Sequence, residues 1–548
     1  MNDVTRTLTR HFFRRFFDND TVHTDGDMQT TVVRTICILS APGLLIAFFV
    51  AALAGHRLPL WMGILYRYLF TLYSFVVMGA VAIFEWHMLF PDRLDFLVLT
   101  PLSIEPKKML VAKVKALAMF LAIVLVGMNA FSTLLVPITF HGGYVRPLLA
   151  HAVAVTMAGV FAAMCVLLVG SVMLCVLDAQ RFRSVSPVVQ ASMMLVLMLL
   201  FLQFVHYGGS IPVMLTGPGL VARWFPPLWF QGLYEELLQG ADAPAFAGVM
   251  TRYALLGTAA VGTLVALLYP MAWARMRTIA MEGAIPKQKR KGQWMDAMLH
   301  RLVKRPGERA VFHFIGQTLR RESRYQVYLA MYCGAGLALA VSSVVVLRNA
   351  GGSVRAGVSS EGMDVVVPLL VFWGVTGLRN AFGFPVNLQA GWMFRVTGVR
   401  MSESASATRM WVRLYAVVVM GVAAVALLAA GCSLERLMVQ CVCGATLGLL
   451  LSEGFFFYQP SVPFNRPRMP GRTNFPMLLT MYFGVFPLLM IYVVKLETQL
   501  AAHPLRLLWV VLLAVAARLM FVALRKLLGE AEEVAEGYDG EFVLLGLS

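Results

Sequence analysis

The sequence contains few charged residues and no recognisable catalytic motif. Only 14% of its 548 residues are Asp, Glu, Lys or Arg, whereas 59% are hydrophobic. No Gly-Lys pair occurs anywhere in the chain, so it has no G-x-x-x-x-G-K-[ST] phosphate loop. The H-E-x-x-H and G-x-S-x-G motifs are absent as well. We therefore expect that this chain does not hydrolyse ATP itself, has no catalytic residues and binds no metal or cofactor.

Cysteine and histidine are too scattered to predict a metal site. The seven cysteines lie mostly within apolar runs, without zinc-like spacing, and we interpret them as small packing residues. The first 30 residues lack the apolar core of a cleavable signal peptide. Instead, the segment from Thr7 to Asp20 places Phe and Arg at helical spacing. This pattern predicts an amphipathic helix in the membrane interface.

Apolar runs of about 20 residues recur along the whole chain, and this is the length that crosses ~30 Å of hydrocarbon. The mean hydropathy is +0.73. Continuous runs of this kind indicate helices, so the predicted fold class is an all-α polytopic membrane protein. We predict twelve spans, at 31–54, 62–84, 114–137, 150–177, 188–206, 250–273, 326–347, 364–383, 411–431, 434–453, 476–495 and 505–525.

The distribution of basic residues predicts the orientation of these spans. The net charge is +17, and 35 of the 46 Lys and Arg residues fall on one side of the membrane in the twelve-span scheme. Because Lys and Arg concentrate on the cytoplasmic side of membrane proteins, both termini are predicted to be cytoplasmic. We expect a multi-pass protein of the cytoplasmic (inner) membrane and no binding of nucleic acid.

The order of sequence features predicts two parallel halves. The predicted domains are an interfacial segment (1–30), a first six-helix half (31–273), a basic linker with a second interfacial helix (274–325), a second six-helix half (326–525) and an acidic tail (526–548). The second interfacial helix corresponds to Val311 to Gln326. Each half also has a long cytoplasmic segment that begins with Phe-Pro, at Phe90 and at Phe384. An internal duplication explains the shared order of these features.

The cytoplasmic segment of the first half is similar to a known family element. It reads DFLVLTPLS from Asp95 to Ser103 and continues through basic residues into the third span. Together with a six-span half and an N-terminal interfacial helix, it resembles the permeases of ABC-2-type transporters. The segment WFPPLWFQGLYEELLQG, from Trp224 to Gly240, is similar to the stretch of short re-entrant helices near the outer surface of such permeases. The counterpart in the second half, Ala390 to Arg413, departs from the pattern because it lacks the Pro-Leu-Ser turn.

The resemblance implies the transmembrane subunit of an ATP-driven exporter, with ATP and Mg²⁺ bound by separate ATPase subunits. Two ATPase copies would dock on cytoplasmic coupling helices, and further membrane subunits could complete the complex. The residues that the resemblance assigns to ATPase contact are Asp95, Phe96, Leu97, Leu99, Pro101, Lys107 and Lys108 in the first half and Trp392, Phe394, Arg395 and Arg400 in the second. Those assigned to the outer re-entrant segment are Pro226, Pro227, Trp229, Tyr234 and Glu235.

Two other functions stay open at this point. One is an ion-coupled secondary transporter, which normally carries an acidic residue inside the membrane as a proton relay. The charged residues within the predicted spans lie toward span ends, where long side chains reach the interface, so the sequence offers no clear relay. The other is a membrane scaffold or accessory subunit that transports nothing. A carrier would respond to an ion gradient without any ATPase, whereas a scaffold would transport nothing with any partner.

Overall fold

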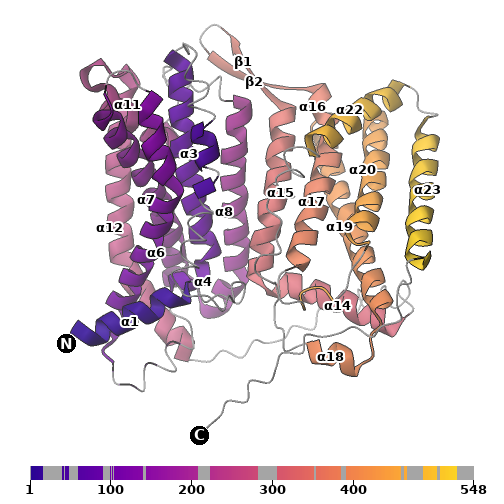
Figure 1. The fold of residues 1–548 in the computed structure, drawn as a ribbon, viewed down its shortest axis with the longest axis horizontal. Coiled ribbons are helices and arrows are strands. Elements are labelled where there is room, and N and C mark those ends of the chain that lie inside the picture. Colours follow the sequence, from indigo (N-terminus) through magenta and orange to yellow (C-terminus); the bar gives the residue numbers. More distant parts are fainter. Residues whose placement is uncertain are drawn as a thin grey trace. The chain divides into compact units, whose positions relative to one another are not determined.

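The structure is a computed structural model of the chain, and it divides into two compact units. Unit 1 comprises Met1–Pro286 with Leu347–Ala356, and unit 2 comprises Lys287–Val346 with Gly357–Ser548. Figure 1 shows the path of the chain. The residues that the structure describes are 2–16, 40–41, 43–48, 60–90, 95, 99, 102, 104–139, 143–207, 223–281, 305–350, 353–383, 391–457, 462–465, 486–502 and 506–527.

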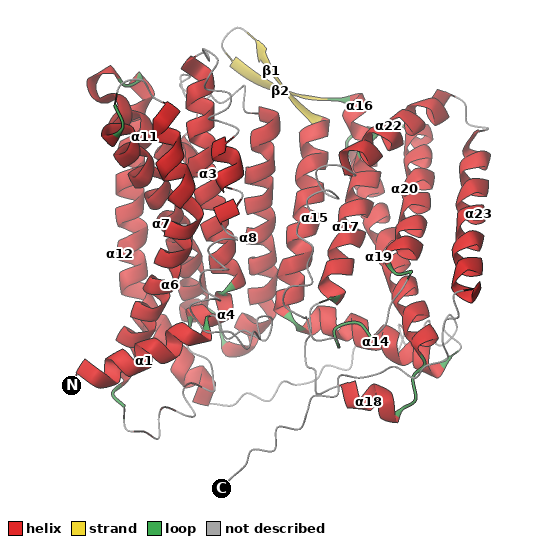
Figure 2. Cartoon of the chain, viewed as in Figure 1, coloured by secondary structure: helices red, strands yellow, loops and turns green. Residues whose placement is uncertain are grey.

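The described part of the chain is almost entirely helical (Figure 2). The helices of unit 1 are α1 (Asn2–Arg15), α3 (Leu60–Phe84), α4 (Trp86–Leu89), α6 (Pro106–Leu135), η2 (Val136–Thr139), α7 (Val145–Val176), α8 (Ala179–Tyr207), α11 (Pro226–Gln239), η4 (Gly240–Asp242) and α12 (Ala245–Met281). Those of unit 2 are α14 (Pro306–Arg321), α15 (Ser323–Val344), α16 (Ser360–Met363), α17 (Val366–Phe382), α18 (Gly391–Val396), α19 (Met401–Ala429), α20 (Leu434–Phe455), α22 (Phe486–Ala502) and α23 (Arg506–Leu527). Strands β1 (Val345–Ala350) and β2 (Ser353–Val358) pair in a two-stranded sheet.

The protein is a multi-pass α-helical membrane protein. Within the described residues, ten helices are long and apolar enough to cross a membrane, and each overlaps one of the predicted spans. The predicted first span, 31–54, lies mostly outside the described residues. Of the predicted eleventh span, 476–495, the residues before Phe486 lie outside the described residues, and α22 covers Phe486–Ala502.

The core of unit 1 is built where α7 packs against α3 and α12. Small residues of α7 permit this close approach. A Cβ atom added at Gly159 would lie 2.6 Å from Leu125 Cδ1 and 2.9 Å from Met78 Cγ, too close without movement of both side chains. In membranes, where lipid is as apolar as the helices, close packing of this kind is a main source of helix association.

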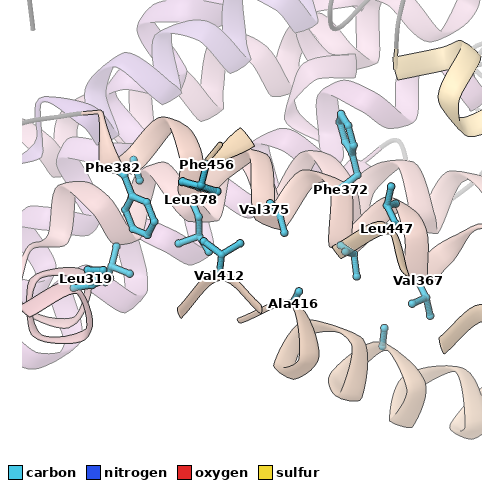
Figure 3. Close-up of a cluster of buried hydrophobic side chains, with 14 of the residues drawn as sticks. Leu319, Val367, Phe372, Val375, Leu378, Phe382, Val412, Ala416, Leu447 and Phe456 are labelled. Atoms are coloured by element: carbon cyan, nitrogen blue, oxygen red, sulfur yellow. The ribbon is translucent and has the colours of Figure 1, made fainter. Parts of the chain in front are cut away.

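The core of unit 2 surrounds α17, which packs against α15, α19 and α20. Figure 3 shows this cluster of buried side chains, which includes Val375 and Leu378 of α17 and Val412 of α19. Nearly every turn of α17 contributes buried residues, so this helix is covered on most of its surface. By contrast, α23 exposes apolar side chains around most of its circumference, as lipid-facing helices do.

Two amphipathic helices each begin five residues earlier than the sequence pattern predicts. The first, α1, covers Asn2–Arg15 rather than Thr7 to Asp20. The second, α14, covers Pro306–Arg321 rather than Val311 to Gln326, and it has proline in its first turn, where the missing N–H costs nothing. In each unit this helix packs on the third span of the corresponding predicted half. In unit 1, α1 packs on α6, and in unit 2, α14 packs on α19. The apolar faces of both helices are therefore buried against protein, and their place in the membrane interface stays a prediction.

Candidate functional site

The helix α1 joins the predicted coupling segment of unit 1 through an ion pair. Arg15, the last residue of α1, donates from Nη1 to Oδ1 of Asp95, whose side chain is only 4% exposed. Leu99, four residues further along the chain, is buried as well. The sequence assigned both residues to contact with a partner, but the structure places both inside unit 1. They therefore support the segment from within, and the role of the segment in ATPase contact stays a prediction.

A second contact joins α1 to α6. The side chain of Lys113 is 1% exposed, and its Nζ atom lies 4.9 Å from the ring centroid of Phe12 and 5.5 Å from that of Phe16. The ring of Phe16 also stacks on Phe120 of α6, with centroids 4.6 Å apart. A buried ammonium over two aromatic faces is stabilised by the ring quadrupoles, by about 2 kcal/mol or more once desolvated. Lys113 therefore fixes α1 to the start of the third span.

We expect that Lys113→Ala loosens α1 from α6 without unfolding unit 1. Loss of about 2 kcal/mol corresponds to a roughly 30-fold larger undocked population of α1. Tryptic cleavage after Arg14 and Arg15 should accelerate accordingly in the purified full chain. The matched control is Lys115→Ala, because Lys115 is an exposed lysine of the same helix. Equal cleavage rates in the two variants would contradict a role for Lys113 in holding α1.

The surface of the predicted coupling segment consists of residues between Leu102 and Lys108. Leu102 is 61% exposed, and Lys107 is exposed beside it. Lys108 Nζ lies 2.9 Å from Oε1 of Glu105, an exposed pair three residues apart on the chain. Phe96, Leu97 and Pro101, also assigned to ATPase contact, lie outside the described residues. Within the described part of this segment, Leu102 is the large apolar residue that a partner can reach.

The corresponding segment of unit 2 is the short helix α18. Phe394 is 3% exposed, and its ring packs edge-on against Phe314 of α14, with centroids 5.2 Å apart. The exposed apolar residues of α18 are Met393 and Val396, neither of which the sequence pattern selected. Arg400 is exposed at the start of α19, and its backbone N–H donates to Glu403 Oε2 over 3.4 Å. Trp392 and Arg395 belong to α18, but their side chains lie outside the described part.

The predicted re-entrant segment forms the helix α11. In Figure 1 it lies at the end of unit 1 opposite to α1. Pro226 and Pro227 occupy its first turn, where proline is compatible with a helix start. The indole of Trp229 donates from Nε1 to the carbonyl of Arg223 over 3.1 Å. Only 14 residues long, α11 is too short to span a membrane, and its re-entrant role stays a prediction.

A buried ion pair joins α11 to α3. Arg67 donates from Nε to Oε1 of Glu235 over 2.7 Å and from Nη2 to Oε2 over 3.0 Å. The side chain of Glu235 is fully buried, and that of Arg67 is 12% exposed. The amides of Gln231 and Gln239 each add one hydrogen bond to this carboxylate, at 2.7 Å and 2.8 Å. Each carboxylate oxygen therefore accepts two hydrogen bonds, and this arrangement offsets the cost of burying the charge.

Tyr234, beside this ion pair, extends the polar contacts to α7. Its hydroxyl lies 2.9 Å from Nδ1 of His151, and the other ring nitrogen of His151 lies 3.2 Å from Oγ of Ser132 on α6. Burial is the main cause that raises the pKa of Tyr234, so its hydroxyl stays protonated. Because these groups bond to one another and are closed to solvent, this arrangement serves to hold α11 in place.

A third polar cluster, which sequence reasoning missed, surrounds Glu453 at the end of α20. We call it the Glu453 cluster, and it comprises Glu453, Arg413, Arg518 and Arg525. Arg413 donates from Nη2 to Oε1 of Glu453, and Arg525 donates from Nη2 to Oε2 over 2.6 Å. Arg518 Nε lies 3.9 Å from Oε1. These residues come from three helices separated by up to 112 positions, so no local pattern could have predicted the cluster.

No metal site is found in the part of the chain that the structure describes, where no three His, Cys, Asp or Glu side chains gather. The cysteines of that part are free thiols. Comparison of the chain with protein-family models, curated proteins and solved structures found no match. The function is therefore inferred from the placement of the residues described above.

Proposed function

We propose that the chain is the transmembrane subunit of an ATP-driven ABC transporter. In this proposal twelve spans form two six-helix halves, both termini are cytoplasmic, and two separate ATPase subunits dock on the cytoplasmic segments. The observation that carries the proposal is the attachment of α1 to the segment after α3, through Asp95 and Lys113. Export as the direction follows from the resemblance to ABC-2-type permeases.

The two-half part of the proposal is supported by matching contacts in the two units. In each unit an amphipathic helix packs on the third predicted span. In each unit an acidic residue at the end of the fourth predicted span also faces an arginine of the last span. These pairs are Asp178 with Arg275, at 4.0 Å, and Glu453 with Arg525, at 2.6 Å. An internal duplication explains why two contacts recur in the same order.

The coupling role is supported by two buried contacts that hold the segment in place, while its apolar residue Leu102 is exposed. A segment that transmits movement from an ATPase to the membrane helices must move as one body with them. The pair of Arg15 with Asp95 fixes the segment to α1, and Lys113 fixes α1 to α6. A push on Leu102 would therefore reach the third span directly. A surface helix that contacts only lipid headgroups would not need these internal supports.

We expect that Leu102→Ala weakens co-purification of the ATPase and reduces ATP-driven transport while the chain stays folded. Truncation of a central apolar residue in a packed interface commonly costs about 2 kcal/mol, or a factor of about 30 in affinity. The measurement is recovery of the ATPase by tagged full-length chain in detergent at low and high salt. Lys107→Ala should have a smaller effect that depends on salt, as charges at an interface rim do.

The matched control for this experiment is Leu256→Ala, because Leu256 is an exposed leucine on the surface of the membrane helix α12. It should recover as much ATPase as the unaltered chain. Full ATPase recovery by Leu102→Ala would contradict the coupling role. Transport driven by an ion gradient in vesicles that lack any ATPase would instead identify a carrier.

One observation favours the carrier as the second candidate. Glu497 of α22 is 2% exposed, and within the described residues neither of its carboxylate oxygens accepts a hydrogen bond of ordinary geometry. Gln440 of the neighbouring helix α20 is equally buried, and its amide is also without a partner there. The thiol of Cys443 on α20 is the neighbour of this carboxyl, and acidic residues buried among membrane helices are typical of proton relays in transporters. The sequence did not predict this acid because the expected span ended before it.

A further inference from the structure

The Glu453 cluster holds more positive charge than its carboxylate compensates. Arg413 and Arg518 both approach the same oxygen, Oε1, while Oε2 is occupied by Arg525. At 3.9 Å, Arg518 is within ion-pair range of Oε1 but beyond hydrogen-bonding distance. A guanidinium has five N–H donors in a planar fork that matches a phosphate or carboxylate group. The donors of Arg518 have no acceptor among the described residues.

The position of the cluster corresponds to the boundary of the hydrocarbon layer. Glu453 lies two residues before the end of α20, which fixes the level of the arginines near that end. Arg518 lies nine residues before the end of α23, about 13 Å along the helix axis, so its side chain must extend toward the interface to reach Glu453. Long basic side chains adopt this orientation near helix ends because phosphate and water are found there.

The side of the cluster formed by α23 faces lipid. Arg518 is 51% exposed. Its neighbours on α23 are large exposed apolar residues, namely Leu512, Val515, Leu519 and Met520. A half-exposed arginine among exposed apolar side chains is costly in a bilayer unless an anion lies within its reach. The anion that a lipid-facing surface meets at this level is the phosphate of a phospholipid headgroup.

We propose that the Glu453 cluster binds the headgroup of an anionic phospholipid, with Arg518 and Arg413 contacting the phosphate and α23 contacting the acyl chains. Basic pockets between membrane helices bind anionic headgroups elsewhere by the same charge complementarity. Glu453 holds the guanidinium groups in place, and the lipid phosphate neutralises the positive charge of the arginines that exceeds the single negative charge of Glu453. This site does not depend on an ATPase, so it is independent of the transport function proposed above.

The test is stabilisation of the purified full-length chain in detergent by phosphatidylglycerol, with phosphatidylcholine and inorganic phosphate as separate arms. A ligand that binds only the folded state stabilises it by a free energy that grows with the logarithm of the ligand concentration divided by Kd, and the unfolding temperature rises accordingly. We expect phosphatidylglycerol to stabilise the chain at a lower mole fraction than phosphatidylcholine does. Arg518→Gln should raise the mole fraction of phosphatidylglycerol needed for half of the effect about fivefold, the factor expected for one lost basic contact at a membrane surface.

The matched control is Arg506→Gln, because Arg506 is an exposed arginine at the opposite end of the same helix. Equal losses in the two variants would overturn the proposal, since they would indicate general attraction to negative charge. Equal stabilisation by inorganic phosphate would also overturn it, because the site would then be an ion site. If Arg518→Gln does not fold, Arg518→Lys provides the test, with about twofold weaker binding expected from loss of the planar fork. An unchanged mole fraction in that variant would contradict the site.

Discussion

Glu235→Gln is expected to lower the free energy of unfolding by about 3–5 kcal/mol. The substitution leaves Arg67, which is 12% exposed, without its carboxylate. It also replaces one of the two acceptor oxygens with an amide donor, so one of the side-chain amides of Gln231 and Gln239 loses its acceptor. An uncompensated buried charge is far more costly than an absent ion pair, and this asymmetry determines the size of the effect. The measurement is the unfolding midpoint of the full chain in mixed micelles with increasing sodium dodecyl sulfate.

A matched control and a rescue variant sharpen this prediction. Glu105→Gln removes a carboxylate that also pairs with a basic residue, Lys108, but that is 66% exposed. Exposed pairs of this kind contribute at most about 1 kcal/mol, so the midpoint should shift little. The double variant Arg67→Met with Glu235→Leu should recover much of the loss, because apolar replacement of both partners is often neutral. A double variant as unstable as Glu235→Gln would show that packing, not charge, causes the loss.

The spans were predictable because each is a local property of the chain. A helix such as α7 consists of one continuous apolar run that is long enough to cross the membrane. The strands β1 and β2 were not predicted, although β-branched residues flank Gly351 and Gly352, a favourable pair for a hairpin turn. The predicted span 326–347 continued through apolar Val345 and Val346, whereas α15 ends at Val344. Apolar composition alone does not distinguish the end of a helix from the start of a strand.

The polar contacts were beyond prediction because they join distant residues. The sequence placed Arg67 at a span end with a side chain directed to the interface. The structure instead pairs Arg67 with Glu235, 168 residues further along the chain. The burial of Asp95 against Arg15 joins residues 80 positions apart in the same way. A charged residue between apolar runs looks the same in sequence whether its partner is water, lipid or a distant side chain.

The predicted coupling segments show the same limit on a smaller scale. The pattern identified the segments but not which of their residues face outward. In sequence, an aromatic residue that fills a partner's groove looks the same as one that packs in the chain's own core. Phe394 packs in the core of unit 2. Leu102 and Val396 are exposed instead. Exposure depends on how α1 and α14 cover each segment, which is a tertiary property.

Glu453→Gln is the second substitution with a large expected effect, a loss of about 3–5 kcal/mol in the free energy of unfolding. Most of this loss is attributed to Arg525, whose side chain is 9% exposed and which would lose its ion pair with the carboxylate of Glu453. Arg413, which is 31% exposed, contributes less because solvent and lipid headgroups screen it. Three arginines would then repel one another, and α23 should separate from α20. A cysteine pair placed across these two helices should form a disulfide more slowly in the variant.

The proposed internal duplication supplies the control for this prediction. Asp178→Asn removes the acidic residue at the corresponding position of unit 1, where the pair with Arg275 is exposed and 4.0 Å long. Its effect on the unfolding midpoint should stay below about 1 kcal/mol. Adding Arg525→Gln to Glu453→Gln should recover part of the loss, because it removes the most deeply buried of the three charges. Phosphatidylglycerol should reduce the loss further if its phosphate replaces the carboxylate. A Glu453→Gln variant as stable as Asp178→Asn would show that the arginines are compensated without Glu453, and the cluster would then have no structural role.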